Sequence, residues 1–137
     1  MNNIHQHELL AICTASDVVR ARTVVSWLAD RIGFNSADQT RLATAVSELA
    51  RNVLVYATEG ICEMYGDSDA MEMRLRVVVE DHGPGIADID AAMKDGYSTG
   101  TGLGAGLPGT RRLVDEFNIE SEPGHTRITI AMVRKAK

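Results

Sequence analysis

Residues 71–85 read MEMRLRVVVEDHGPG, and this stretch decides which kind of fold the chain can adopt. Apolar and polar residues alternate along it, which predicts a β-strand with one face toward a core. The apolar residues on that face are Met73, Leu75, Val77 and Val79. The period of two places Asp81 on the same face. Because a carboxylate that faces a core needs a partner, the end of this strand is a candidate site.

A glycine-rich segment follows the strand. Eight of the chain's 12 glycines lie between Gly83 and Gly109, which predicts a long loop with one short helix over 88–93. A helix is then expected from Leu107 and Pro108 through Phe117, since proline is tolerated in a first helical turn.

The residues before the strand predict two helices. A first strand is expected over 9–15, followed by a helix that Ser16 and Asp17 cap and Gly33 ends. Its apolar residues recur every three or four positions: Val18, Ala21, Val25, Leu28 and Ile32. Residues 36–39 have the capping-box form and open a second helix, which Gly60 closes. Its apolar stripe comprises Leu42, Ala43, Val46, Leu49, Ala50, Val53, Leu54 and Ala57.

Short strands complete the pattern. A weak strand over 61–65 and a turn over 66–69 precede the central strand, and the chain ends in a hairpin of 117–121 and 126–133. Thr126 shares the parity of the apolar residues in the last strand. This order of elements predicts an α/β fold, a two-layer sandwich of a mixed β-sheet covered on one face by helices, in a single domain over residues 1–137.

Composition excludes several classes of function. The chain is 45% hydrophobic and 24% charged, as expected of a globular domain, and it has a net charge of −5, which argues against a nucleic-acid partner. Cys13 and Cys62 show neither a disulfide framework nor zinc-ligand spacing. No signal peptide and no apolar run of membrane-spanning length is present, so we expect a cytoplasmic protein with no membrane partner.

Three short motifs are candidates for chemistry. Glu48 and Asn52 lie one turn apart beside the apolar stripe, where a solvated helix flank is the alternative. Gly83 and Gly85 follow the inward Asp81 and allow close backbone approach. A glycine run over 100–107 ends at a helix N-terminus, which favours phosphate. The patterns G-x-G-x-x-G at 104–109 and G-x-S-x-G at 96–100 lack the strands that a dinucleotide site or a hydrolase needs.

Together these motifs resemble the N, G1 and G2 boxes of the GHKL ATPase superfamily, and within it the RsbT-type switch serine/threonine kinases. The segments that carry the likeness are SELARN at 47–52, EDHGPGI at 80–86 and GLGAGLPG at 102–109. Arg51 and Tyr56 favour this type over the related anti-sigma-factor kinases. The resemblance implies a Bergerat-type ATP-binding fold with an ATP lid over about 86–106.

The resemblance also implies roles for individual residues. Glu48 is the expected general base, and Asn52 is expected to hold Mg²⁺. ATP is expected to bind at Asp81, Gly83, Gly85, Ile86, Gly102, Gly104, Gly106, Leu107 and Thr126. Lys94, Arg111 and Arg112 are nearby cations among which the sequence does not choose.

The resemblance implies an ATP-dependent serine/threonine protein kinase that phosphorylates a STAS-domain protein in a bacterial stress-signalling module. When released, it would activate a PP2C-type phosphatase or another downstream regulator. The alternative is an ATP-dependent anti-sigma factor or binding module with little kinase activity. A histidine kinase catalytic domain is a third option, but the sequence lacks a phosphoacceptor helix.

Overall fold

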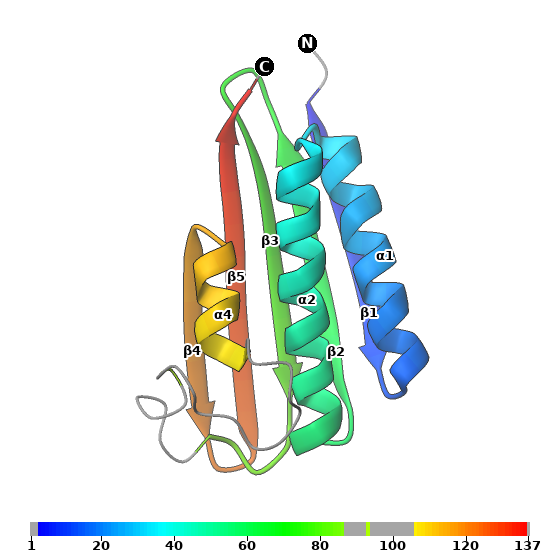
Figure 1. The fold of residues 1–137 in the computed structure, drawn as a ribbon, viewed down its shortest axis with the longest axis vertical. Helices are drawn as coiled ribbons and strands as arrows, with labels where there is room; N and C mark the ends of the chain where they lie inside the picture. The colour runs from blue at the N-terminus through cyan, green and yellow to red at the C-terminus, as the bar shows by residue number, and fades with distance from the viewer. Residues whose placement is uncertain (1–2, 87–92, 94–105, 137) are drawn as a thin grey trace.

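The computed structural model describes residues 3–86, Met93 and 106–136. Their elements, in chain order, are β1 (Ile4–Ile12), α1 (Ala15–Ile32), α2 (Ser36–Tyr56), β2 (Gly60–Ser68), β3 (Glu72–Asp81), α4 (Gly106–Leu113), β4 (Glu116–Glu122) and β5 (His125–Lys135). The strands form one five-stranded sheet in the order β1-β2-β3-β5-β4, and α1, α2 and α4 lie together on one of its faces (Figure 1). The expected two-layer α/β sandwich is therefore confirmed.

Each neighbouring pair of strands in this sheet is antiparallel, a more regular arrangement than the mixed sheet expected. Two of the pairs, β2 with β3 and β4 with β5, are hairpins and must be antiparallel. The connection from β1 to β2 contains two helices that run in opposite directions (Figure 1). Because these two helices are antiparallel, the chain returns to the end of the sheet at which β1 finishes, and β2 then runs back alongside β1.

The core lies between the sheet and the helix layer and is aliphatic. The predicted inward residues of α1 and β3 are all buried: Val18, Ala21, Val25, Leu28, Ile32, Met73, Leu75, Val77 and Val79. On α2 the centre of the predicted stripe is buried, whereas Ala43, Leu54 and Ala57 are partly exposed at its margins. Within the described residues, no helix is both long enough and apolar enough to span a membrane.

The start of the chain differs from the prediction. β1 begins at Ile4 instead of residue 9 and ends at Ile12. The cap of α1 is Thr14, whose side chain accepts a hydrogen bond from the backbone N–H of Asp17. The Asp17 carboxylate accepts from the backbone N–H groups of Thr14 and Cys13, which completes a capping box. Ser16 therefore lies inside the helix that it was expected to cap.

The second helix and the middle strands differ in similar ways. Asn35 caps α2 by accepting from the Asp38 N–H at 2.8 Å, and the helix ends at Tyr56, so Gly60 begins β2 instead of closing the helix. β2 continues through the expected turn to Ser68. Gly66 lies inside this strand, where a Cβ would lie 2.9 Å from Ile32, so the close packing of α1 on β2 requires glycine.

The last helix is shorter than predicted. α4 ends at Leu113, and Phe117 belongs to β4. The hairpin that joins β4 to β5 turns at Pro123 and Gly124, between the two predicted strands, and Gly124 has a φ of 90°. Two predictions fall on residues that the structure does not describe. They are the short helix expected over 88–93, apart from Met93, and nearly all of the lid expected over about 86–106.

Candidate functional site

A row of polar residues crosses three neighbouring strands at one end of the sheet. Asp81 on β3 pairs with Thr126 on β5, and Thr126 pairs with Ser121 on β4. On the other side of Asp81 the paired residue is Gly60 of β2. Thr126 and Asp81 both have the parity of the buried residues of their strands, as predicted. The helix-facing side of the sheet thus carries a carboxylate beside two hydroxyls.

These groups are connected by hydrogen bonds. Oδ1 of Asp81 accepts from the backbone N–H of Gly83 at 2.9 Å, which forms a tight turn directly after β3. Thr126 is 6% exposed, and its Oγ1 lies 2.7 Å from Oγ of Ser121. The Ser121 hydroxyl also accepts from the backbone N–H of Ile86 at 2.7 Å. The turn after β3 is therefore bonded at both of its ends.

The two glycines of this turn are in close contact with neighbouring elements. A Cβ on Gly83 would lie 2.6 Å from Cβ of Ala57, at the end of α2. Gly85 has a φ of 85°, and a Cβ there would lie 2.4 Å from the carbonyl oxygen of Glu122. Because neither position leaves room for a side chain, the turn packs closely between α2 and the β4–β5 hairpin.

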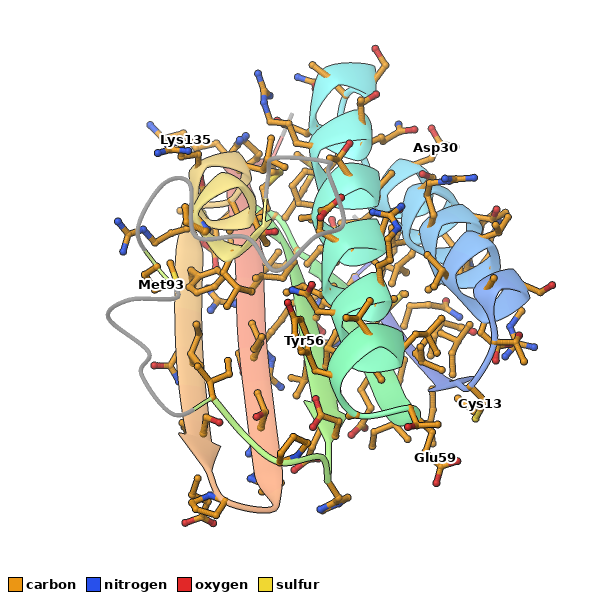
Figure 2. All side chains as sticks on the ribbon, turned by 60° about the horizontal axis from the view of Figure 1, so that its bottom comes forward. Cys13, Asp30, Tyr56, Glu59, Met93 and Lys135 are labelled. Carbon is orange, nitrogen blue, oxygen red and sulfur yellow. The ribbon has the colours of Figure 1, made fainter. Side chains whose placement is uncertain are left out.

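Packing against glycine also places the end of α2 over the row. A Cβ on Gly60 would lie 2.9 Å from Cγ1 of Val53 and 3.2 Å from Cβ of Asp81. Val53 follows Asn52 directly in the sequence. The half of α2 that contains Glu48 and Asn52 therefore lies at the same end of the molecule as the row. Figure 2 shows this end of the helix layer, with Tyr56 near the last turn of α2.

Glu48 is a buried carboxylate, 9% exposed, so the solvated flank does not describe it. Nη1 of Arg51 donates to Oε1 of Glu48 at 2.6 Å, and this charge-assisted contact compensates for burial of the carboxylate. Asn52 is half-buried one turn later, and no hydrogen bond joins its side chain to another described residue. The helix therefore offers a held carboxylate and an amide oxygen on adjacent turns.

Helix α4 packs beside α2 in the same layer. Gly106 begins it with a φ of 52°, and Leu107 is 7% exposed. Gly102 and Gly104, like Lys94, lie outside the described residues. Arg111 and Arg112 are exposed in the last turn of α4, at the opposite end of the helix from Gly106.

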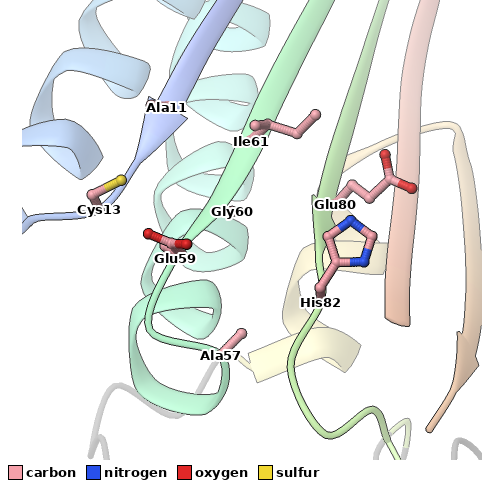
Figure 3. Close-up of a pocket in the computed structure, with 8 residues that line it drawn as sticks. All are labelled: Ala11, Cys13, Ala57, Glu59, Gly60, Ile61, Glu80 and His82. Atoms are coloured by element: carbon pink, nitrogen blue, oxygen red, sulfur yellow. The ribbon is translucent and has the colours of Figure 1, made fainter. Parts of the chain in front are cut away.

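Two other features of the molecule are separate from the row. Asp115 is bonded to Arg134 and His125 to Glu80, so the hydrolase-like pattern does not bring its acid and its histidine together. A pocket of about 370 Å³ lies on the helix-free face of the sheet (Figure 3). Its lining residues are Ala11, Cys13, Ala57, Glu59, Gly60, Ile61, Glu80 and His82. None of the predicted site residues is among them.

Sequence reasoning missed two contacts of the site. In the sequence, Arg51 was used only to distinguish RsbT-type kinases from anti-sigma-factor kinases. Its spacing of three residues from Glu48 on a helix already allowed the ion pair. Ser121 was not considered. A two-residue turn at Pro123 and Gly124 pairs Ser121 with Thr126, so the hairpin pattern contained a signal for it.

The chain is similar in sequence to several known proteins. A family model described as a histidine kinase-like ATPase domain matches residues 13–132. The serine/threonine-protein kinase RsbT of Bacillus subtilis is 44% identical over 121 residues, which cover 88% of this chain and 91% of RsbT. The anti-sigma F factor of Caldanaerobacter subterraneus is 30% identical over 110 residues, which cover 76% of each chain.

A solved structure has the same fold. The crystal structure of the RsbU and RsbW domains of Rv1364c from Mycobacterium tuberculosis matches with a TM-score of 0.64 and 20% identity. The match covers 100% of this chain and 34% of the crystallised chain, so this chain spans about a third of that protein.

Proposed function

Because this chain belongs to the family of histidine kinase-like ATPase domains and is a protein serine/threonine kinase of the RsbT type, we propose that it acts in a partner-switching module by phosphorylating a STAS-domain protein. The observation that carries the proposal is the placement of Glu48 and Asn52 on α2 at the same end of the molecule as Asp81 and Thr126. A phosphoryl-transfer site needs a base, a cation ligand and a nucleotide cradle together.

The residues of the row suit an adenine nucleotide. Asp81 presents a carboxylate fixed by Gly83, and Thr126 presents a hydroxyl beside it. In the proposed site these two residues hold the adenine end, Gly83, Gly85 and Ile86 form the adjoining wall, and Gly106 and Leu107 stand at the N-terminus of α4 on the phosphate side. Gly102 and Gly104 are proposed to contribute backbone N–H groups there.

Asn52 is the proposed protein ligand for Mg²⁺. This ion commonly takes few protein oxygens and completes its octahedron with phosphate and water oxygens. The described residues contain no cluster of three or more His, Cys, Asp or Glu side chains suited to a metal. When bound, Mg·ATP would supply the transferable γ-phosphoryl group and neutralise its charge.

Glu48 is the proposed general base. Its carboxylate would accept the proton of a substrate serine or threonine hydroxyl as that oxygen forms a bond to the γ-phosphorus of ATP, while the bond from this phosphorus to the bridging oxygen breaks and ADP leaves. Arg51 holds one carboxylate oxygen at 2.6 Å and restricts the side chain to one orientation, leaving the other oxygen for the substrate. Positioning of this kind is a large part of phosphoryl-transfer catalysis.

The partners follow from the proposed function. One relative is named a serine/threonine-protein kinase and another an anti-sigma F factor, and the likeness to both supports regulatory partners here. We propose a STAS-domain substrate, a PP2C-type phosphatase as the downstream target, and a cytoplasmic location. The 30% identity to anti-sigma F factor favours one second candidate, a nucleotide-dependent anti-sigma factor.

Replacement of Glu48 tests the proposal. We expect Glu48→Ala to reduce phosphoryl transfer to a STAS protein encoded beside this gene by at least a hundredfold, since general-base catalysis contributes about 10²- to 10⁴-fold. The affinity for Mg·ATP should change little, because Glu48 is not placed at the adenine end. The measurements are the intact mass of the STAS protein after incubation and the heat of nucleotide binding.

Asp81→Asn is the contrasting variant, with the expected loss in nucleotide binding itself. Full phosphoryl transfer by Glu48→Ala would remove Glu48 as the base. If the unmodified chain binds Mg·ATP, modifies no STAS protein and retains a sigma factor, the anti-sigma function would replace the proposed one.

A further inference from the structure

We infer that Ser121 is a positioning residue of the nucleotide site, which holds the turn after β3 and directs the hydroxyl of Thr126. The inference rests on the proposed function, because it assigns a task within the proposed adenine pocket. It concerns the nucleotide-binding step alone and is independent of Glu48.

The contacts of Ser121 connect separate parts of that pocket. Its Oγ accepts from the backbone N–H of Ile86 at 2.7 Å, across 35 residues of sequence. The same atom lies 2.7 Å from Oγ1 of Thr126 and 3.4 Å from the carbonyl oxygen of His125. Ser121 is half-buried, and the register places it one strand beyond Thr126 and two beyond Asp81.

Counting protons assigns a direction to these bonds. A serine hydroxyl has one proton to donate and two lone pairs, one of which receives the Ile86 N–H. The distance of 2.7 Å to Thr126 is typical of a good O–H···O bond, whereas 3.4 Å to His125 is long. Of the two acceptors, Thr126 and the His125 carbonyl, we assign the Ser121 proton to Thr126 because that distance is the shorter. The proton of Thr126 is then left to donate toward the adenine pocket.

The turn itself makes the contact specific. Gly85 packs so closely on the hairpin that an added Cβ would meet the Glu122 carbonyl at 2.4 Å and Oγ of Ser121 at 3.3 Å. Oγ of Ser121 thus lies beside Gly85 and accepts from the backbone N–H of the next residue, Ile86. Loss of the hydroxyl should loosen the turn and free Thr126 together.

The experiment measures the binding of Mg·ADP and Mg·ATP by calorimetry to the unmodified chain, Ser121→Ala, Thr126→Val and the double variant. We expect Ser121→Ala to raise both dissociation constants about fivefold, the effect of one lost hydrogen bond. Because Ser121 acts in part through Thr126, the double variant should lose less affinity than the product of the two single effects. If the double variant raises the dissociation constant by the product of the two single-variant factors, the inference is wrong.

Hydrogen exchange of the Ile86 amide in the nucleotide-free protein gives a second measurement. It should be faster in Ser121→Ala and unchanged in Thr129→Val, the matched control, which removes a hydroxyl from the opposite face of the same hairpin. Should Ser121→Ala fold poorly, Ser121→Cys keeps a similar volume with a weak donor and should show the same loss of affinity.

The outcomes separate the inference from the proposed function. If the unmodified chain binds neither nucleotide, the proposed function fails and the inference fails with it. If the unmodified chain binds the nucleotides and Ser121→Ala binds them equally well, only the inference fails. The same holds if Ser121→Ala binds equally well but melts at a lower temperature.

Discussion

At the scale of single residues, the site is defined by where side chains are absent. Gly60 admits Val53 of α2, and Gly83 admits Ala57, the residue directly after α2, so the end of the helix reaches the strand that ends in Asp81. The sequence predicted a glycine-rich turn after an inward carboxylate, and this is confirmed. It could not show that the space left by Gly83 is filled by Ala57, since that contact joins residues 26 positions apart.

Gly83→Ala should therefore disturb the site through the helix. The added Cβ would lie 2.6 Å from Cβ of Ala57, closer than such atoms approach, so α2 or the turn must move. We expect a loss of about 1–3 kcal/mol in the free energy of unfolding, as for overpacked sites, and a weaker affinity for Mg·ATP. Urea denaturation and calorimetry measure the two effects.

Gly124→Ala is the matched control. Gly124 has a φ of 90°, so alanine is strained there by about 1 kcal/mol, but nothing lies within 4 Å of the added Cβ. This variant should lose stability and keep nucleotide affinity. Equal losses of affinity in both variants would show that contact with α2 does not matter.

At the scale of elements, the periodic patterns predicted which faces are buried, and the ends of elements were less accurate. Thr14, Ser16 and Asp17 all have cap-forming side chains, and Asn35 and Ser36 present the same choice. Which of them caps depends on where the chain leaves the preceding element. The outer face of β1 begins with His5 and His7, which are polar because helices cover only the other face, so the start of this edge strand resembled a loop.

The capping box of α1 makes a prediction about pH. Hydrogen bonds, the largest from the backbone N–H of Cys13, lower the pKa of Asp17 from its ordinary value of 3.8. A lowered pKa in the folded state means that the stabilisation is present above pH 3.8 and is lost as the pH falls through the folded-state value. Asp17→Asn should therefore be less stable than the unmodified chain at neutral pH, and the difference should shrink below about pH 4.

Urea denaturation at a series of pH values measures this difference. Ser16→Ala is the control at the cap that the structure does not use, and it should change stability by no more than about 0.5 kcal/mol at any pH. A difference between Asp17→Asn and the unmodified chain that stays constant from pH 6 to pH 3 would contradict the role of the carboxylate.

At the scale of the whole molecule, the architecture followed from the order of elements, whereas its long-range connections did not. Asp38 is 2% exposed at the start of α2, and its carboxylate accepts from Nε of Arg134 at 2.9 Å, 96 residues away. Arg134 also donates to Asp115 at 2.8 Å. No local pattern predicts such a cluster, because each residue alone resembles an ordinary surface charge.

Arg134→Ala should lower the free energy of unfolding by about 2 kcal/mol. It removes one of two partners of a buried carboxylate, while Arg41 remains at 2.8 Å. Arg74→Ala is the control, because its ion pair with Glu116 is more exposed and such pairs contribute about 0–1 kcal/mol. Equal stabilities of the two variants in urea would show that the Asp38 cluster adds nothing beyond a surface pair.

The direction of the strands has a practical consequence for experiments on partners. β1 starts and β5 finishes at the end of the sheet opposite the turn after β3 (Figure 1). The ten residues of β3 separate the two ends by about 33 Å. A biotin attached near either terminus would therefore leave the proposed nucleotide end facing away from a sensor surface, and molecules tethered in this way could be tested for partners with that end accessible.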